Sequence, residues 1–375
     1  MIINNSVLKY DEKIIFALRD LYNRYGYSRF EMSKFEEYDL YARNKDFLIS
    51  DNIISFTDTN GKLMALKPDV TISIIKNNLY KSGTVQRYYY NENVYRVSKS
   101  TDSFKEIMQT GLECIGDVDA YCITEVLMLA AKSLKTISDE CLLSVSFVDF
   151  VSEIVDGFEV SGSIKKQIYK CIGEKNIHEL DEICKSNSID KIKTNVLKEL
   201  CMLHGSIDEV LPNVESLLKD HVSEKSFYEF KSIMMSLKAD GLSNVFKLDF
   251  SLINNLKYYN GIIFNGYING VTGTILSGGQ YNRLMKKFNT SCDAIGFAVY
   301  LDVLDRYNVV TNEFDADIAI IYSEEDDVTD LRRIIEKFIV DGNTVVTFRA
   351  LPDCFKCKKL FKYCDGEVIP FENND

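Results

Sequence analysis

Residues 84–116 read TVQRYYYNENVYRVSKSTDSFKEIMQTGLECIG, and this stretch decides the fold that we predict for the chain. Two runs rich in apolar and aromatic residues, 84–97 and 104–116, flank the polar connection SKSTDS. Aromatic and β-branched residues are typical of strands, and a short polar connection between two such runs is typical of a hairpin loop. We therefore predict two long neighbouring strands of an antiparallel sheet.

A helix and a second hairpin are predicted before these strands. Residues 10–25 carry apolar side chains at helical spacing, and Gly26 follows where a left-handed capping residue is expected. Within 53–69, IISFTDTNGKLMALKPD, apolar and polar residues alternate on both sides of Asn60-Gly61. This dipeptide favours a tight type I′ turn with two positive-φ residues, so we expect a β-hairpin there.

Helical and strand-like segments alternate in the middle of the chain. Helical periodicity returns at 117–136 and continues almost unbroken from about 150 to 240. Strand-like segments follow at 246–250, 258–264 and 271–277. Because the sheet resumes after the long helical segment, we interpret residues 150–240 as a helical insertion.

The C-terminal residues form a pattern of their own. From residue 316 the sequence predicts a strand, a helix, a strand, an irregular Cys/Lys-rich part and a last short strand near Val368. We predict a core over residues 1–312, which includes the insertion, and a small C-terminal α/β unit over residues 313–375.

Composition and charge restrict the classes of function. The 56 acidic residues outnumber the 44 basic residues among 375, which gives a net charge of -12 and disfavours nucleic-acid binding. The longest uncharged window, 258–282, contains six Gly and four Asn, so it is too polar for a membrane helix. The N-terminus lacks the order of regions of a signal peptide. We expect a cytoplasmic protein that does not contact a membrane.

The 10 cysteines are scattered, and in a reducing compartment we expect most of them to be buried thiols. Cys354, Cys357 and Cys364 form one cluster with CxxC spacing, which could bind a metal ion with a fourth ligand. No second CxxC or nearby His completes such a site, so we predict no metal and no cofactor and leave the role of this cluster unassigned.

Polar residues recur on segments that are predicted to face the core. Gln109 and Glu113 are four residues apart on a predicted strand, so they point to the same face, and Gly111 between them would leave room for a ligand. The alternative is that these residues lie on the solvent-facing side of a half-exposed sheet. Spacing alone does not decide between a pocket wall and a solvated face.

Four segments resemble motifs of one family. Residues 88–96 together with 104–116 are similar to motif 2 of class II aminoacyl-tRNA synthetases, in the form found in histidyl-tRNA synthetases. Residues 64–71, MALKPDVT, resemble the segment LRP(E/D)xT of that family, and residues 256–264, LKYYNGIIF, resemble LDYYTGxxF. Residues 278–301 resemble motif 3.

The resemblance extends from about residue 10 to residue 305 and implies an α+β fold. Its expected core is the antiparallel sheet of class II synthetases, with six or seven strands flanked by helices and interrupted by a helical insertion. The small C-terminal α/β unit would then be a reduced anticodon-binding-like domain.

The resemblance also implies a binding site for histidine or a similar ligand. Asp69 and Thr71 would hold an α-amino group, and Arg96 would meet a carboxylate or an attached phosphate. The residues that would orient the imidazole ring and the amino group are Gln109, Glu113, Tyr258 and Tyr259.

Other positions depart from the synthetase pattern. Asn254 and Val303 stand where the family carries the arginines that face the phosphates of ATP. Ser98 replaces the motif 2 glutamate, Lys105 is at best the counterpart of the loop arginine, and Ser33 replaces the motif 1 proline. Without guanidinium groups to stabilise the developing charge, aminoacylation is disfavoured, and we predict no catalytic residue.

This combination of features resembles the regulatory subunits of ATP phosphoribosyltransferase. The resemblance implies a non-catalytic homodimer, formed through the core, whose partner is a short-form ATP phosphoribosyltransferase catalytic subunit at the first step of histidine biosynthesis. Histidine feedback through this chain is a further expectation. Two alternatives remain: a divergent histidyl-tRNA synthetase or histidine-activating enzyme, and a synthetase-like protein that serves an unrelated partner.

Overall fold

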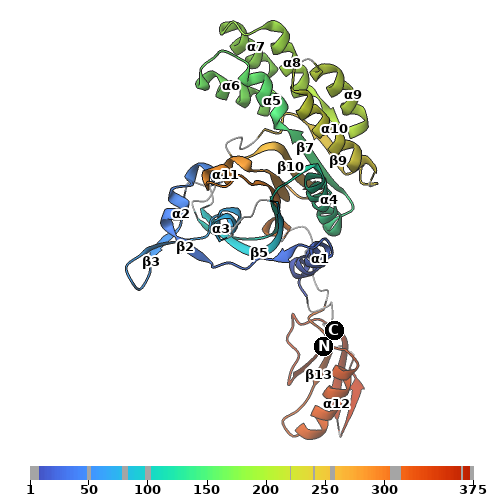
Figure 1. The fold of residues 1–375 in the computed structure, drawn as a ribbon. Helices are drawn as coiled ribbons and strands as arrows, with labels where there is room; N and C mark the ends of the chain where they lie inside the picture. Colours follow the sequence, from blue (N-terminus) through green and yellow to red (C-terminus); the bar gives the residue numbers. More distant parts are fainter. Residues whose placement is uncertain are drawn as a thin grey trace. The chain divides into compact units, whose positions relative to one another are not determined.

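The chain divides into two compact units, Met1–Asn308 and Val309–Asp375 (Figure 1). The computed structural model describes residues 8–48, 52–77, 83–97, 103–219, 221–239, 241–253, 258–304, 314–364 and 366–371.

A nine-stranded sheet lies at the centre of the first unit, with the strand order β1-β5-β6-β12-β11-β10-β7-β9-β8. The six strands from β5 to β7 in this order pair antiparallel, as predicted. The sheet is wider than the six or seven strands expected, because the short β1 and β8 and the parallel-paired β9 extend its two edges. The strands are β1 (Ser28–Arg29), β5 (Val85–Val97), β6 (Phe104–Gly116), β7 (Cys141–Phe147), β8 (His204–Gly205), β9 (Phe246–Asp249), β10 (Asn260–Ile268), β11 (Leu276–Gln280) and β12 (Asp293–Tyr300).

The paired strands β5 and β6 confirm the hairpin predicted from residues 84–116. Their register runs without interruption from Val85 opposite Gly116 to Val97 opposite Phe104. Glycine is required at position 111 for a different reason from the one that we expected. A Cβ there would lie 2.3 Å from the carbonyl oxygen of Phe297 and 2.6 Å from the hydroxyl of Tyr90. Gly111 therefore makes room for β12 and for the ring of Tyr90. The prediction that it leaves room for a ligand is wrong.

Two helices, α1 (Tyr10–Arg24) and α4 (Ala120–Ile137), pack against each other and against the sheet. Their apolar faces form the main core, and Tyr22 of α1 shares a buried hydrogen bond of 2.9 Å with Ser133 of α4. Gly26 ends the first helix with a φ of 77°, as predicted. The helix α11 (Asn282–Lys287) follows β11.

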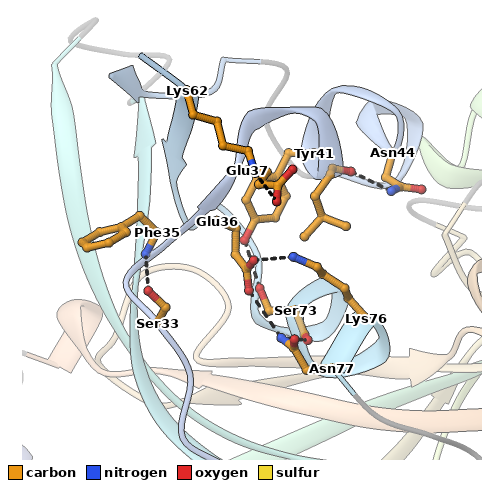
Figure 2. Close-up of polar contacts among 11 residues, drawn as sticks. Ser33, Phe35, Glu36, Glu37, Tyr41, Asn44, Lys62, Ser73, Lys76 and Asn77 are labelled. Atoms are coloured by element: carbon orange, nitrogen blue, oxygen red, sulfur yellow. Dashed lines mark hydrogen bonds and ion pairs between the residues drawn. The ribbon is translucent and has the colours of Figure 1, made fainter. Parts of the chain in front are cut away.

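A small three-stranded sheet, β2 (Phe35–Glu37), β4 (Leu63–Leu66) and β3 (Ser55–Thr57), lies beside the helices α2 (Tyr38–Ala42) and α3 (Val70–Asn77). Figure 2 shows how polar contacts tie these elements together. Glu36 accepts hydrogen bonds from Lys76 at 2.7 Å and from Asn77 at 3.3 Å, and the hydroxyls of Tyr41 and Ser73 lie 2.9 Å apart. These contacts fix α3, whose first residues belong to the candidate site.

The turn between β3 and β4 differs from the predicted type I′ turn. Gly61 has a φ of 78°, whereas Asn60 is not among the residues with positive φ. The carboxylate of Asp58 organises the connection instead, because it accepts from the amides of Asn60 at 2.9 Å and Lys62 at 2.8 Å. An Asx-type turn of this kind needs only one left-handed residue.

The predicted helical segment is confirmed as a run of helices between β7 and β9, coloured green to yellow in Figure 1. Ser161, Asn176, Asp190 and Ser206 each accept a hydrogen bond from a first-turn amide, so polar N-caps separate consecutive helices. The helices are α5 (Val148–Asp156), α6 (Gly162–Gly173), α7 (Ile177–Ser186), α8 (Lys191–Met202), α9 (Ile207–Leu218) and α10 (Glu224–Ala239). Among the described segments, none of the helices has both the length and the apolar composition to cross a bilayer.

Among its described residues, the second unit has its own four-stranded sheet, in the order β14-β13-β15-β16, and one helix. Its separate core includes Ile318, Ile320, Leu331 and Tyr363. The elements of this unit are β13 (Ala316–Ile321), α12 (Val328–Val340), β14 (Val345–Phe348), β15 (Cys357–Cys364) and β16 (Glu367–Pro370). The first unit also contains two short 3-10 helices, η1 (Lys45–Phe47) and η2 (Asp302–Leu304).

The Cys/Lys-rich part was expected to be irregular, and this expectation is wrong because it forms the inner strand β15. Cys357 and Cys364 stand at the two ends of β15. At about 3.3 Å per residue their Cα atoms are roughly 23 Å apart, so a single ion cannot bind both. Within the described ranges, no group of three or more His, Cys, Asp or Glu side chains is arranged to hold a metal ion.

We predict that a chain ending at residue 312 folds without the second unit. The first unit contains both large hydrophobic clusters, whereas the second unit has a separate cluster of its own. Circular dichroism should show that the truncated chain keeps the helical signal of the first unit. Its thermal unfolding should occur at the melting temperature that the first unit has in the full chain. Loss of the soluble core after truncation would contradict this prediction.

Candidate functional site

A cavity of about 670 Å³ lies in the first unit, within the size range of roughly 300–1,000 Å³ that is usual for small-molecule sites. It is bounded by the sheet, the start of α3, the residues before β10, η1 and the insertion helix α6. All seven residues predicted from the sequence line this one cavity: Asp69, Thr71, Arg96, Gln109, Glu113, Tyr258 and Tyr259.

The carboxyl group of Glu113 stands in the cavity wall, and this residue is only 2% exposed. Its two oxygens accept hydrogen bonds from the hydroxyls of Thr71 at 2.7 Å and Tyr281 at 2.6 Å. Burial raises the pKa of Glu113 to about 8, although both hydrogen bonds oppose this rise. Position 296 on β12 must be glycine, because a Cβ there would lie 1.8 Å from a carboxyl oxygen of Glu113.

A second buried carboxyl group, that of Asp69, stands at the start of α3. It accepts a hydrogen bond from the amide of Ile72 at 2.9 Å, so it caps the helix as well as lining the cavity. Burial raises the pKa of Asp69 above its ordinary value, and the Ile72 amide and the charge of Arg96 act in the opposite direction. The cavity therefore holds two carboxyl groups that a cationic ligand would stabilise in their charged form.

Strand β5 holds the segment before α3 at three points. The buried ammonium group of Lys67 pairs with Glu92 at 2.8 Å, and the amide of Tyr95 donates to the carbonyl of Lys67 at 2.8 Å. Arg96 donates from Nε to the carbonyl of Pro68 at 3.0 Å. These contacts fix Asp69 opposite the guanidinium group of Arg96.

Aromatic rings close the cavity on the side of β10 and α11. Tyr258 and Tyr259 pack edge to face with ring centres 4.6 Å apart, and Tyr281 lies 5.9 Å from Tyr258. The hydroxyl of Tyr258 interacts with Thr71, and that of Tyr259 interacts with Ser277. Burial holds the pKa of both phenols well above the usual range, so both act as neutral hydrogen-bonding groups.

Several lining residues are not among the seven named as ligand-binding in the sequence analysis. Tyr281 binds Glu113 directly, and Tyr90, Ser277 and Tyr300 also line the wall. Tyr90 lies in a strand that was predicted, and alternation with neighbours that face the cavity could have identified it, whereas the strand that carries Tyr300 was not predicted from the sequence. Lys45 on η1 and the α6 residues Lys166, Tyr169 and Lys170 complete the outer wall, and nothing in their local sequence signals this position.

The positions that depart from the synthetase pattern fall in different places. Val303 packs against the main hydrophobic core and does not line the cavity described above. Lys105 is exposed, and Ser33 is exposed and accepts a hydrogen bond from the amide of Phe35 at 3.3 Å (Figure 2). Asn254 and Ser98 lie outside the described residues.

Residues 5–304 match the family model described as histidyl-tRNA synthetase. The ATP phosphoribosyltransferase regulatory subunit of Clostridium kluyveri is 30% identical over 292 residues, which cover 76% of this chain and 74% of that protein. A solved structure described as an ATP phosphoribosyltransferase regulatory subunit/histidyl-tRNA synthetase from Bacillus halodurans superposes with a TM-score of 0.76, at 22% identity over 96% of both chains. A chain of the ATP phosphoribosyltransferase (HisG:HisZ) complex from Thermotoga maritima gives a TM-score of 0.61, at 17% identity over 79% of this chain and 98% of that chain.

The fold and the cavity together define a class II synthetase-like protein, which confirms the predicted fold class. The likeness to the two solved structures supports the fold, whereas the relationship is carried by the family model and the Clostridium protein. The chain belongs to the histidyl-tRNA synthetase family, in the branch whose members are named ATP phosphoribosyltransferase regulatory subunits.

The buried carboxyl group of Glu113 predicts that stability falls as pH rises. Its pKa of about 8 in the folded protein lies above the ordinary value of 4.5, so between these pH values the folded protein keeps a proton that the unfolded chain releases. The free energy of unfolding should therefore decrease through this window, by at most about 1.4 kcal/mol per pH unit. Glu113→Gln cannot ionise, and it should lose this part of the pH dependence.

Urea unfolding at pH 5 and pH 8 measures the effect. We expect the loss of stability between these two pH values to be smaller in Glu113→Gln than in the wild type by on the order of 3 kcal/mol. Asp69 keeps its own contribution in both proteins. The exposed Glu199 on α8 provides the matched control, because Glu199→Gln should leave the pH dependence unchanged. Equal slopes for Glu113→Gln and the wild type would contradict the assignment.

Proposed function

We propose that this chain is a non-catalytic regulatory subunit that assembles with a short-form ATP phosphoribosyltransferase catalytic subunit. The complex would perform the first step of histidine biosynthesis, and the chain would pair with a second copy of itself through the core. Membership in the branch of regulatory subunits supports this role, as does the likeness to a chain of the Thermotoga maritima complex.

The observation that carries the proposal is the unequal loss of synthetase features. The seven residues implied to bind an amino acid meet in one cavity, whereas Asn254 and Val303 carry no charge at the two positions implied to face ATP phosphates. Amino-acid binding without activation suits a sensor or a structural subunit. Adenylate formation would lack several kcal/mol of charge stabilisation.

We further propose that the cavity binds histidine as a feedback ligand. Its α-amino group would lie between Asp69 and Thr71, its carboxylate would meet Arg96, and its ring would contact Glu113 and the Tyr258 phenol. A zwitterion in a closed cavity needs carboxylates for its ammonium group and a guanidinium group for its carboxylate. An imidazole ring needs one hydrogen-bond donor and one acceptor.

The assembly is tested by co-expression of this chain with a short catalytic subunit. We expect a stable hetero-oligomer by light scattering, and phosphoribosyl transfer to ATP that depends on the presence of both chains. This chain alone should give no histidine-dependent ATP–pyrophosphate exchange, and Asn254→Arg alone should not create it because Val303 is still present. Separate elution without any stimulation of the catalytic subunit would refute the role, and histidine-dependent exchange would establish the synthetase alternative instead.

Histidine binding is tested by calorimetry on this chain. We expect millimolar or tighter binding that Glu113→Ala weakens by roughly 1–3 kcal/mol, the usual cost of leaving a charged hydrogen-bonding group without its partner. Because Glu113 is largely protonated at pH 7 when free, binding of a cationic group should release protons, and the measured heat should change with the ionisation enthalpy of the buffer.

Glu199→Ala, on an exposed helix face, is the control that should bind histidine like the wild type. If the wild type gives neither heat nor a thermal shift with histidine, while Glu113→Ala merely lowers the melting temperature, these residues are structural. Feedback would then have to reside on the catalytic partner.

A further inference from the structure

The cavity has an outer part whose lining differs in charge from the amino-acid subsite proposed for histidine. The amino-acid subsite is lined by two buried carboxyl groups and by Arg96, whereas η1 and α6 contribute Lys45, Lys166 and Lys170 to the outer part. None of these lysines lies in the segments that resemble synthetase motifs. The proposed histidine site therefore leaves these three positive charges unexplained.

One face of α6 is directed at the cavity. The lining residues of this helix and its C-cap recur at intervals of three and four residues: Lys166, Tyr169, Lys170, Gly173 and Glu174. Another side of α6 is buried in the main core through Ile168, Cys171 and Ile172. Because these buried side chains fix the helix, its lysines are presented to the cavity.

Contacts of Phe47 hold η1 beside the amino-acid subsite. The ring centre of Phe47 lies 6.3 Å from that of Tyr258, and Nζ of Lys287 lies 4.9 Å from the centre of the Phe47 ring. Lys287 also donates to the carbonyl of Arg43 at 2.7 Å, just before η1. The outer wall at Lys45 is therefore continuous with the wall that carries Tyr258.

The outer part presents hydrogen-bond donors without acceptors. Lys45, Lys166 and the hydroxyl of Tyr169 have no hydrogen-bond or ion-pair partner among the residues that the structure describes. Burial raises the pKa of Tyr169 to about 12, so its hydroxyl stays protonated and able to donate. Two ammonium groups and one hydroxyl from two elements thus border the same cavity.

Two acidic residues in the outer wall do not neutralise these donors. Glu174 lies 3.9 Å from Lys170, between two exposed side chains, and Asp46 makes a contact of its own. In the described part of the chain, neither carboxylate forms an ion pair with Lys45 or Lys166. The outer part therefore keeps positive charge for a ligand.

We propose that the outer part of the cavity, between η1 and α6, is a subsite for a phosphate-bearing anion. Lysine binds phosphate as a point charge, and its long stem lets ammonium groups on two sides of an opening reach one anion. A tetrahedral phosphate group has oxygens in several directions, as donors from two elements require, whereas the two oxygens of a carboxylate lie in one plane. The phosphate accepts hydrogen bonds from Lys45, Lys166 and Tyr169.

This outer subsite is separate from both sites implied by the synthetase resemblance. Asn254 and Val303 stand at the positions implied to face ATP phosphates, and Val303 does not line the cavity. The volume of about 670 Å³ is typical of sites for drug-sized ligands, so an amino acid beside Asp69 leaves room for an anion at Lys45 and Lys166. The two ligands can therefore occupy the cavity together.

Calorimetry on the full-length chain without histidine tests the outer subsite, with inorganic pyrophosphate and ATP as separate probes. We expect pyrophosphate to bind at millimolar concentration or tighter, with an affinity that falls as salt is added because the contacts are ionic. Binding of ATP alone, where it requires Lys45 and Lys166, would uphold the subsite and identify a nucleotide as the source of the phosphate.

Single substitutions locate the anion. Lys45→Gln and Lys166→Gln each remove one charge from an exposed side chain, and each should weaken binding roughly fivefold or more. Tyr169→Phe removes only the hydroxyl and should weaken binding about two- to threefold. Lys191→Gln is the matched control, because this exposed lysine on α8 does not line the cavity, and it should bind the anion like the wild type.

Equal affinities of Lys45→Gln, Lys166→Gln and Lys191→Gln for both probes would overturn the proposal, because the anion would then bind elsewhere. Absence of heat and of a thermal shift with both probes would overturn it as well. Neither outcome bears on the proposed histidine site or on assembly with a catalytic subunit, since histidine and the partner are left out of this experiment.

Discussion

The buried carboxyl group of Glu113 is the interaction on which the rest of the site depends. Its hydrogen bonds join β6 to two distant segments, because Thr71 is 42 residues and Tyr281 is 168 residues from Glu113 in the sequence. They fix the start of α3, the middle of the sheet and the start of α11 around one group. The contact also dictates glycine at position 296, since any side chain there would collide with the carboxyl oxygen. A buried polar network of this kind stabilises a unique arrangement only when each member finds its partner.

The sequence predicts those parts of the fold in which local pattern and tertiary environment agree. Long aromatic strands around residues 84–116 and the capped first helix are of this kind, because alternation and helical spacing there match the faces that become buried. The prediction failed where tertiary context overrode composition. The Lys-rich β15 looks irregular, yet it pairs with β13 on one side and β16 on the other. The predicted turn type at Asn60-Gly61 was wrong because hydrogen bonds to the Asp58 side chain take the place of a second left-handed residue.

The candidate site was predictable from motifs but not from spacing. Gln109 and Glu113 share a face by alternation, whereas the proximity of Asp69, Arg96 and Tyr258 follows only from the resemblance to the synthetase family. Side chains contributed by distant elements escaped both arguments. Tyr169 and its lysine neighbours come from the insertion helix α6, and their local sequence is that of an ordinary amphipathic helix. A cavity wall of this kind is a property of the tertiary arrangement.

The alternative in which the polar residues merely satisfy one another can be weighed against the geometry. It expects Arg96 to pair with Glu113 across the sheet, but Arg96 donates to the carbonyl of Pro68, and the oxygens of Glu113 are taken by Thr71 and Tyr281. A purely structural network would also be expected to pack tightly, because protein interiors leave few voids. Here the same groups border a cavity of about 670 Å³, and both carboxyl groups have raised pKa values that reduce stability at neutral pH. Retaining such a costly arrangement is understandable if a ligand repays it by supplying the missing positive charge. The balance of physical arguments therefore favours a binding site over a relic of the synthetase core.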